Sequence, residues 1–130
     1  MSDNNFSDFT KNYVSLNQNG EISRFAGGDD FWSLSAEKLN AIGENWLITE
    51  FYFVEDWQTW EMHPHGEEIV YLLSGSMDLI LERDGISEKI ELRGKGLVII
   101  PEETWHTAKV FEPSNMLVIT LGKETKVKEV

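Results

Sequence analysis

The amino-acid sequence predicts an all-β protein built as a single jelly-roll β-barrel. From about residue 46 onward, apolar and polar side chains alternate, which is the pattern of strands with one buried face. Gly, Pro, Asp, Asn or Ser residues interrupt this alternation roughly every eight to ten positions, as expected for turns between short strands. Helix-forming sequence is confined to one short segment. A series of short antiparallel strands in a chain of this length fits a jelly roll.

The first expected element is a short helix over residues 35–43. Ser35 is a favourable N-cap, because its side-chain oxygen can accept a hydrogen bond from a free N–H group of the first turn. Gly43 is a residue type often found where a helix ends. The eight strands expected after this helix cover residues 46–54, 58–63, 69–74, 77–82, 86–92, 97–100, 106–111 and 116–121.

The strand over residues 86–92 shows the alternation most clearly. Ile86, Ile90 and Leu92 share one parity and therefore one face, whereas Ser, Lys and Glu residues occupy the other. The pair Asp84-Gly85 precedes this strand, and a type I′ turn needs positive φ at both of its central residues, which this pair tolerates. The sequence therefore predicts a tight hairpin between residues 77–82 and 86–92.

Length and pattern predict one domain with three parts. Residues 1–44 form an N-terminal extension with a short helix, packed on the barrel; residues 45–122 form the barrel; residues 123–130 form a charged C-terminal tail. A chain of 130 residues, 41% of them hydrophobic, can bury a substantial core without dividing into two domains.

Charge and composition exclude several classes of partner and of chemistry. The chain has 11 Lys and Arg residues against 23 Asp and Glu residues, and a net charge of −12 repels nucleic acids and anionic membrane surfaces. No apolar run is long enough to span a bilayer and the N-terminus lacks a secretory pattern, so a cytoplasmic location is expected. Because there is no cysteine, any metal must be held by nitrogen and oxygen ligands.

All three histidines lie in two short segments, residues 60–68 (WEMHPHGEE) and residues 101–106 (PEETWH). Imidazole and carboxylate groups are the usual nitrogen and oxygen ligands of divalent first-row metals, and both segments carry both groups. Three histidines can also serve as ordinary polar surface groups. The clustering favours a metal site.

These segments resemble the two sequence motifs of the cupin superfamily. Residues 68–75 (EIVYLLSG) match the glutamate, six residues and glycine of the first motif, and residues 101–106 match the proline and histidine of the second. The resemblance covers roughly residues 45–121 and implies a small β-barrel and a homodimer. Two positions depart from the pattern: Glu103 stands where the family usually has glycine, and Gly96 is one residue closer to Pro101 than usual.

The resemblance leaves two alignments of the first motif open. In the literal one, His63 and His65 form the paired histidines, but too few residues then separate them from Glu68. Counting back from Glu68 by the family spacing places the pair at Glu61 and His63. Residues i and i+2 of a strand point to the same face, which suits this pair. His65 lies between Pro64 and Gly66, in a sequence typical of a turn.

We therefore expect a divalent ion, with Fe, Mn and Zn all suited to this ligand set. The expected ligands are Glu61, His63, Glu68 and His106, with His65 as the alternative ligand. The sequence does not assign a catalytic residue. His65 and Glu61 are the candidates for that role.

The resulting functional hypothesis is a metal-binding cupin that acts on a small organic molecule, as a dioxygenase or an isomerase-type enzyme. Two alternatives remain open. One is a non-catalytic cupin that binds or senses a small molecule, and the other is a metal-free, epimerase-like cupin in which a histidine acts as a general base.

Overall fold

The computed structural model describes residues 6–130, so residues 1–5 of the predicted N-terminal extension lie outside the described residues. Strands make up 57% of the structure and helices 9%, which confirms the prediction of an all-β fold. Within residues 6–130, no helix combines the length and the apolar character that crossing a bilayer requires.

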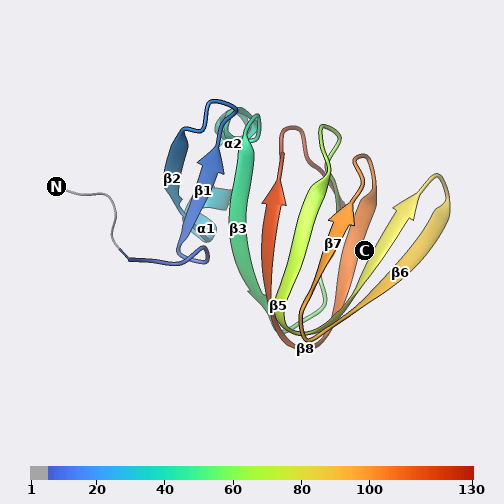
Figure 1. Cartoon of the computed structure of the whole chain (residues 1–130). Helices are drawn as coiled ribbons and strands as arrows, with labels where there is room; N and C mark the ends of the chain where they lie inside the picture. Colours follow the sequence, from blue (N-terminus) through green and yellow to red (C-terminus); the bar gives the residue numbers. More distant parts are fainter. Residues whose placement is uncertain (1–5) are drawn as a thin grey trace.

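Residues 6–130 form nine strands and two short helices (Figure 1). In order, they are β1 (Asn12–Leu16), β2 (Ile22–Ala26), α1 (Asp29–Trp32), α2 (Ala36–Ile42), β3 (Trp46–Phe53), β4 (Thr59–Met62), β5 (Glu68–Arg83), β6 (Ile86–Arg93), β7 (Gly96–Ile100), β8 (Trp105–Thr120) and β9 (Lys126–Glu129).

The two long strands β5 and β8 connect the two halves of the sheet. In one half, β5 pairs with β7 and β8 pairs with β3, which continues into β1 and β2. In the other half, β5 pairs with β6 and β8 pairs with β4, which continues into β9. Figure 1 shows the strands converging at the lower edge and diverging toward the upper edge. The jelly-roll architecture is confirmed, although the sheet does not close on itself.

The bend in β5 depends on Gly75. The pairing of β5 with β8 shifts register on both sides of this residue. Its backbone φ angle of 111° is one that residues other than glycine rarely adopt. A Cβ atom built at this position would lie 2.2 Å from Ser114 Oγ and 2.6 Å from the Pro113 carbonyl oxygen. Glycine therefore permits the close approach of β5 and β8 where both strands change from one half of the sheet to the other.

This bend explains why the sequence predicts more short strands in this region than the structure contains. The segments 69–74 and 77–82 are two parts of β5, and the segments 106–111 and 116–121 are two parts of β8. In each strand the hydrogen-bonded ladder continues through the irregular residues that interrupt the alternation.

The predicted hairpin and helix are both confirmed. Asp84 and Gly85 have φ values of 53° and 77°, which are the positive values that the tight turn requires. In α2, Ser35 caps the first turn by accepting a 3.2 Å hydrogen bond from the Lys38 N–H group. Gly43 has an ordinary φ of −69°, but a Cβ atom there would lie 2.5 Å from the Lys123 backbone nitrogen. Close packing, not a left-handed backbone, thus accounts for this glycine.

Three strands were not expected from the sequence. The β1–β2 hairpin extends the sheet beyond β3, and β9 adds to the edge of β4. Tyr13 of β1, Phe31 of α1 and Leu47 of β3 form a second buried cluster beside the main core. The sequence of β9 lacks the apolar alternation that predicts a strand, and all of its residues are exposed. Its position at the edge of the sheet therefore depends on backbone pairing with β4.

A row of apolar residues crosses the outer face of the sheet. The row consists of consecutive partners on five neighbouring strands: Ile99, Ile69, Ile119, Ile48 and Val14. Ile99 is 55% exposed.

The homodimer implied by the sequence resemblance stays a prediction. We expect a second copy of the chain to cover this apolar row, because pairing of the two copies removes apolar surface from water. Light scattering should then return twice the monomer mass of 14.9 kDa. A mass of 14.9 kDa at micromolar protein concentration would contradict the predicted homodimer.

Candidate metal centre

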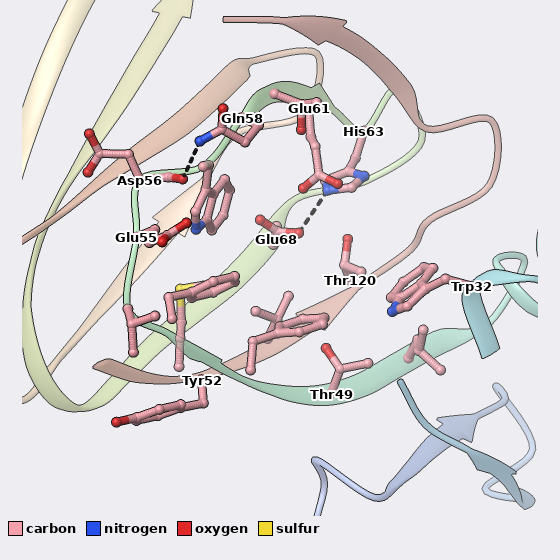
Figure 2. A pocket seen from close by; sticks show the side chains of 18 residues that line it. Trp32, Thr49, Tyr52, Glu55, Asp56, Gln58, Glu61, His63, Glu68 and Thr120 are labelled. Carbon is pink, nitrogen blue, oxygen red and sulfur yellow. Dashed lines mark hydrogen bonds and ion pairs between the residues drawn. The ribbon is translucent and has the colours of Figure 1, made fainter. Parts of the chain in front are cut away.

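Three strands and the turn after β4 bring four candidate residues into the space between the two halves of the sheet. Glu61 of β4 lies directly opposite His106 of β8 in the strand register. His63 follows the last residue of β4 and keeps the parity of Glu61. The chain then turns back, and Glu68 begins β5. Figure 2 shows Glu61, His63 and Glu68 gathered at one end of a cavity.

The side chains of Glu61, His63 and His106 are close enough to share one ion. One ligand atom from each of Glu61, His63 and His106 lies within 4.8 Å of the other two. The Glu68 carboxylate lies between the histidines, with Oε2 2.8 Å from His63 Nε2 and Oε1 3.2 Å from His106 Nε2. His63, Glu68 and His106 are all buried.

The far nitrogen of each imidazole is held by a hydrogen bond that fixes the tautomer. His106 Nδ1 lies 3.1 Å from the Thr104 carbonyl oxygen, which can only accept, so Nδ1 carries the proton. His63 Nδ1 lies 2.8 Å from Thr125 Oγ1. The Thr125 hydroxyl group donates its own hydrogen to the Gly122 carbonyl oxygen at 2.7 Å, so it accepts from His63. In the neutral rings, both Nε2 atoms therefore present lone pairs to the centre.

A positive charge between the two neutral imidazoles and the Glu68 carboxylate would stabilise this arrangement. In the part of the chain that the structure describes, neither His63 Nε2 nor His106 Nε2 makes a hydrogen bond, although both atoms are buried. Two lone pairs that face an ionised carboxylate at about 3 Å repel it, and unpaired buried polar atoms are costly. A proton on an imidazole or a metal ion coordinated by both Nε2 atoms would remove the conflict.

The pKa shifts within the cluster have the same origin. Burial raises the pKa of Glu68, but contacts with the imidazoles of His106 and His63 in their protonated forms outweigh burial and lower that pKa to about 2. Burial and the charge of Glu68 raise the pKa of Glu61. Burial lowers the pKa of His106, yet the protonated ring can donate to Glu68 at 3.2 Å, and this contact and the Glu68 charge outweigh burial, so the net shift is upward. Without metal, the site therefore favours protons on His106 and Glu61, which a metal ion would displace.

Glu103 accounts for one departure from the cupin motif. Its φ of 57° is in the left-handed region, which explains why glycine is usual at this position. The Glu103 N–H group donates a 3.0 Å hydrogen bond to the His63 carbonyl oxygen. The turn before β8 is thus tied to the segment that carries His63, with glutamate in the glycine conformation.

His65 lies away from the cluster. It is in the turn between β4 and β5, its side chain is 48% exposed, and its Nε2 atom is 2.7 Å from Glu124 Oε1. This location of His65 matches the turn that was predicted from the flanking proline and glycine. The structure therefore places Glu61, rather than His65, beside His63 and His106.

Thr125 is a residue of the site that the sequence analysis missed. It lies in the charged C-terminal segment, 62 residues from His63, and no local pattern connects the two. The strand pairing of β9 with β4 brings the Thr125 segment to His63. Hydrogen bonds of this kind orient metal-binding histidines and fix their tautomer.

Thr125→Val is expected to weaken divalent-metal binding by about ten- to a hundredfold, because His63 loses the acceptor that holds its Nδ1–H group. Thr125→Ser keeps the hydroxyl group and should bind metal nearly as the unmodified protein does. Calorimetric titration of metal into the two variants would measure the difference. Equal affinities would show that Thr125 has no part in positioning His63.

The cluster opens into a cavity of about 550 Å³. Residues of α1, β3, the β3–β4 loop, β4 and the last part of β8 line it, so the cavity lies between the two halves of the sheet (Figure 2). Pockets of roughly 300–1,000 Å³ are typical of small-molecule sites. The lining residues are Trp32, Leu47, Thr49, Phe51, Tyr52, Phe53, Val54, Glu55, Asp56, Trp57, Gln58, Thr59, Glu61, His63, Glu68, Met116, Val118 and Thr120.

Two solved structures are similar in fold to about three-fifths of this chain, and a third is similar at a lower TM-score. An oxalate oxidase is 14% identical, with 62% of this chain and 44% of that chain covered at a TM-score of 0.54. A structure of Fe(II)-HppE with the alternative substrate (S)-1-HPP is 10% identical, with 58% and 42% covered at a TM-score of 0.50. A cupin superfamily protein from Desulfitobacterium hafniense is 21% identical, with 58% and 65% covered at a TM-score of 0.49. The chain has the cupin fold.

The likeness to these cupin structures concerns the fold. This chain spans less than half of the length of the HppE and oxalate oxidase chains it matches. HppE has been solved with Fe(II) and with Co(II), so at least one neighbour with this fold binds divalent metals. No family model and no curated protein matches the sequence.

Proposed function

We propose that this chain is a metal-dependent cupin that acts on a small organic molecule in the cavity beside the metal. The observation that carries the proposal is the pair of buried imidazoles whose Nε2 atoms face the Glu68 carboxylate without hydrogen bonds. Glu61 supplies a further carboxylate within reach of both imidazoles. This donor set suits a divalent first-row ion such as Fe(II), Mn(II) or Zn(II).

His63, His106, Glu61 and Glu68 would hold the ion. Such an ion polarises a bound oxygen atom and lowers the pKa of bound water, which serves oxygen insertion, isomerisation or hydrolysis of a small molecule. The chain itself provides the orientation of the imidazoles, through Thr125 and the Thr104 carbonyl, and the cavity that partly excludes water.

Metal analysis of the purified protein tests this proposal. We expect about one divalent ion per chain after loading, loss of that ion on treatment with a chelator, and its return on dialysis against Fe(II), Mn(II) or Zn(II). Protein that retains no ion after loading with any of the three would contradict the proposal.

The metal-free, epimerase-like alternative also has an observation in its favour. Glu68 contacts both imidazoles, and the pKa of His106 is raised, so a proton can take the place of the metal as the positive charge. Histidine paired with a buried carboxylate is an arrangement that serves a general base. If the loaded protein remains free of metal, this alternative becomes the better one.

A further inference from the structure

Four aromatic rings form a continuous wall along one side of the cavity. Trp32 stacks on Phe51 with ring centroids 6.3 Å apart, Phe51 stacks on Phe53 at 5.7 Å, and Phe53 meets Trp57 at 5.3 Å. Trp57 in turn lies edge-on to His106 at 6.2 Å. The wall thus runs from Trp32, which is 49% exposed at the rim, to the metal cluster. Its rings line the cavity and offer an aromatic surface against which a planar ligand can pack.

Unpaired polar groups lie at the inner end of the same cavity. Thr120 is only 9% exposed, and its Oγ1 atom has no hydrogen-bond partner among residues 6–130. Figure 2 shows this oxygen pointing from β8 toward Glu68 and His63. Trp57 also lines the cavity, and its buried Nε1–H group has no partner in the described part of the chain. Because the indole N–H group can only donate and the hydroxyl group can donate, both suit a ligand with a hydrogen-bond acceptor.

The charge of the lining disfavours an anionic ligand. Glu55, Asp56, Glu61 and Glu68 border the cavity, whereas no lysine or arginine of residues 6–130 does. An anion buried there would lack the paired cation that recognition of carboxylates and phosphates usually requires. A divalent ion held by two carboxylates and two neutral imidazoles has no formal net charge left to attract an anion.

We propose that the cavity binds a neutral, planar aromatic molecule that stacks along the Trp32–Trp57 wall and presents a carbonyl-type acceptor to Thr120. The proposal rests on the proposed function in placing the acceptor end of the ligand beside the metal cluster. The aromatic wall and Thr120 belong to no part of that cluster, and no lysine or arginine among residues 6–130 lines the cavity, so the binding preference can be measured with and without metal.

The test compares 2-naphthamide, 2-naphthoate and naphthalene, with binding followed by calorimetry or tryptophan fluorescence on chelated and on metal-loaded protein. The amide is neutral with an acceptor, the naphthoate is its anionic counterpart, and naphthalene has no acceptor. We expect the amide to bind at least about tenfold more tightly than the naphthoate, because the anion finds no cation in the cavity. Equal or tighter binding of the naphthoate to chelated protein would overturn the proposal.

Two pairs of measurements locate the ligand. Thr120→Val should weaken binding of the amide by about three- to tenfold, the range for one hydrogen bond, and leave binding of naphthalene unchanged. Trp32→Leu should weaken binding of both, whereas Trp46→Leu should weaken neither, because Trp46 is 38% exposed on β3 and does not line the cavity. Equal effects of the two tryptophan variants, or an equal effect of Thr120→Val on both ligands, would contradict this placement. Melting temperatures of the variants verify that they are folded.

The outcomes separate this proposal from the proposed function. If the protein holds no metal but shows these preferences, the ligand class stands and the metal-dependent function fails. If the protein holds metal but binds all three compounds alike, the metal-dependent function stands and the ligand class fails.

Discussion

Replacing His106 or His63 with alanine is expected to abolish stoichiometric metal binding. Each variant removes one imidazole from a cluster in which both Nε2 atoms lie within about 3 Å of the Glu68 carboxylate. The remaining ligands would be one imidazole and the carboxylates, and loss of a first ligand bond costs more than the ten- to a hundredfold typical of an outer partner. Elemental analysis after metal loading and desalting measures the effect.

His65→Ala is the matched control for these variants. The His65 side chain is 48% exposed and contacts Glu124, away from the cluster, so this variant should keep most of the metal. Circular dichroism of all three variants verifies that the fold is retained. If His65→Ala empties the site while His63→Ala leaves it full, the ligand set is wrong.

Glu61→Gln is the second substitution with a large expected effect. It keeps the shape of the side chain and removes its charge. Two unit charges about 4 Å apart interact by about 4 kcal/mol at an effective dielectric constant near 20, which corresponds to roughly a thousandfold in affinity. We expect the variant to bind metal on the order of a hundred- to a thousandfold more weakly in calorimetric titrations. Unchanged affinity would favour the literal alignment, in which His63 and His65 are the histidine pair.

The pH dependence of metal binding distinguishes a lost ligand from a general disturbance. Burial and the charge of Glu68 raise the pKa of Glu61, so metal binding must release a proton from Glu61 in the pH range above its ordinary value of 4.5. Affinity should therefore fall as the pH is lowered into that range. Glu61→Gln has no such proton to release, and the negative charge of Glu61 no longer raises the pKa of His106. A shallower decline of affinity with falling pH is expected for the variant, and an equal slope would contradict the role of Glu61.

Local features of the sequence were sufficient to predict the strands around the candidate site and the types of residue that gather there. Alternation and the Asp84-Gly85 turn predicted the hairpin, because both depend on residues adjacent in the chain. The side-chain period of a strand likewise put Glu61 and His63 on one face, and the flanking proline and glycine put His65 in a turn. These are properties of two to five consecutive residues, which the sequence contains directly.

Contacts between distant segments could not be predicted in this way. Thr125 reaches His63 across 62 residues, and Trp32, in the extension expected to pack on the barrel, stacks on Phe51 of β3. Neither residue lies in a pattern that indicates its partner. Both positions depend on strands at the edges of the sheet, β9 and the β1–β2 hairpin, whose sequences carry weak strand signals.

The sequence by itself thus determined the all-β class, the strand faces and the residue types able to bind a metal. Only the tertiary structure decided which tautomers the histidines adopt, where the aromatic wall runs and which buried polar atoms remain unpaired. The reason is physical: alternation and turns reflect the geometry of neighbouring residues, whereas the site forms where β5 and β8 bend and bring the two halves of the sheet face to face.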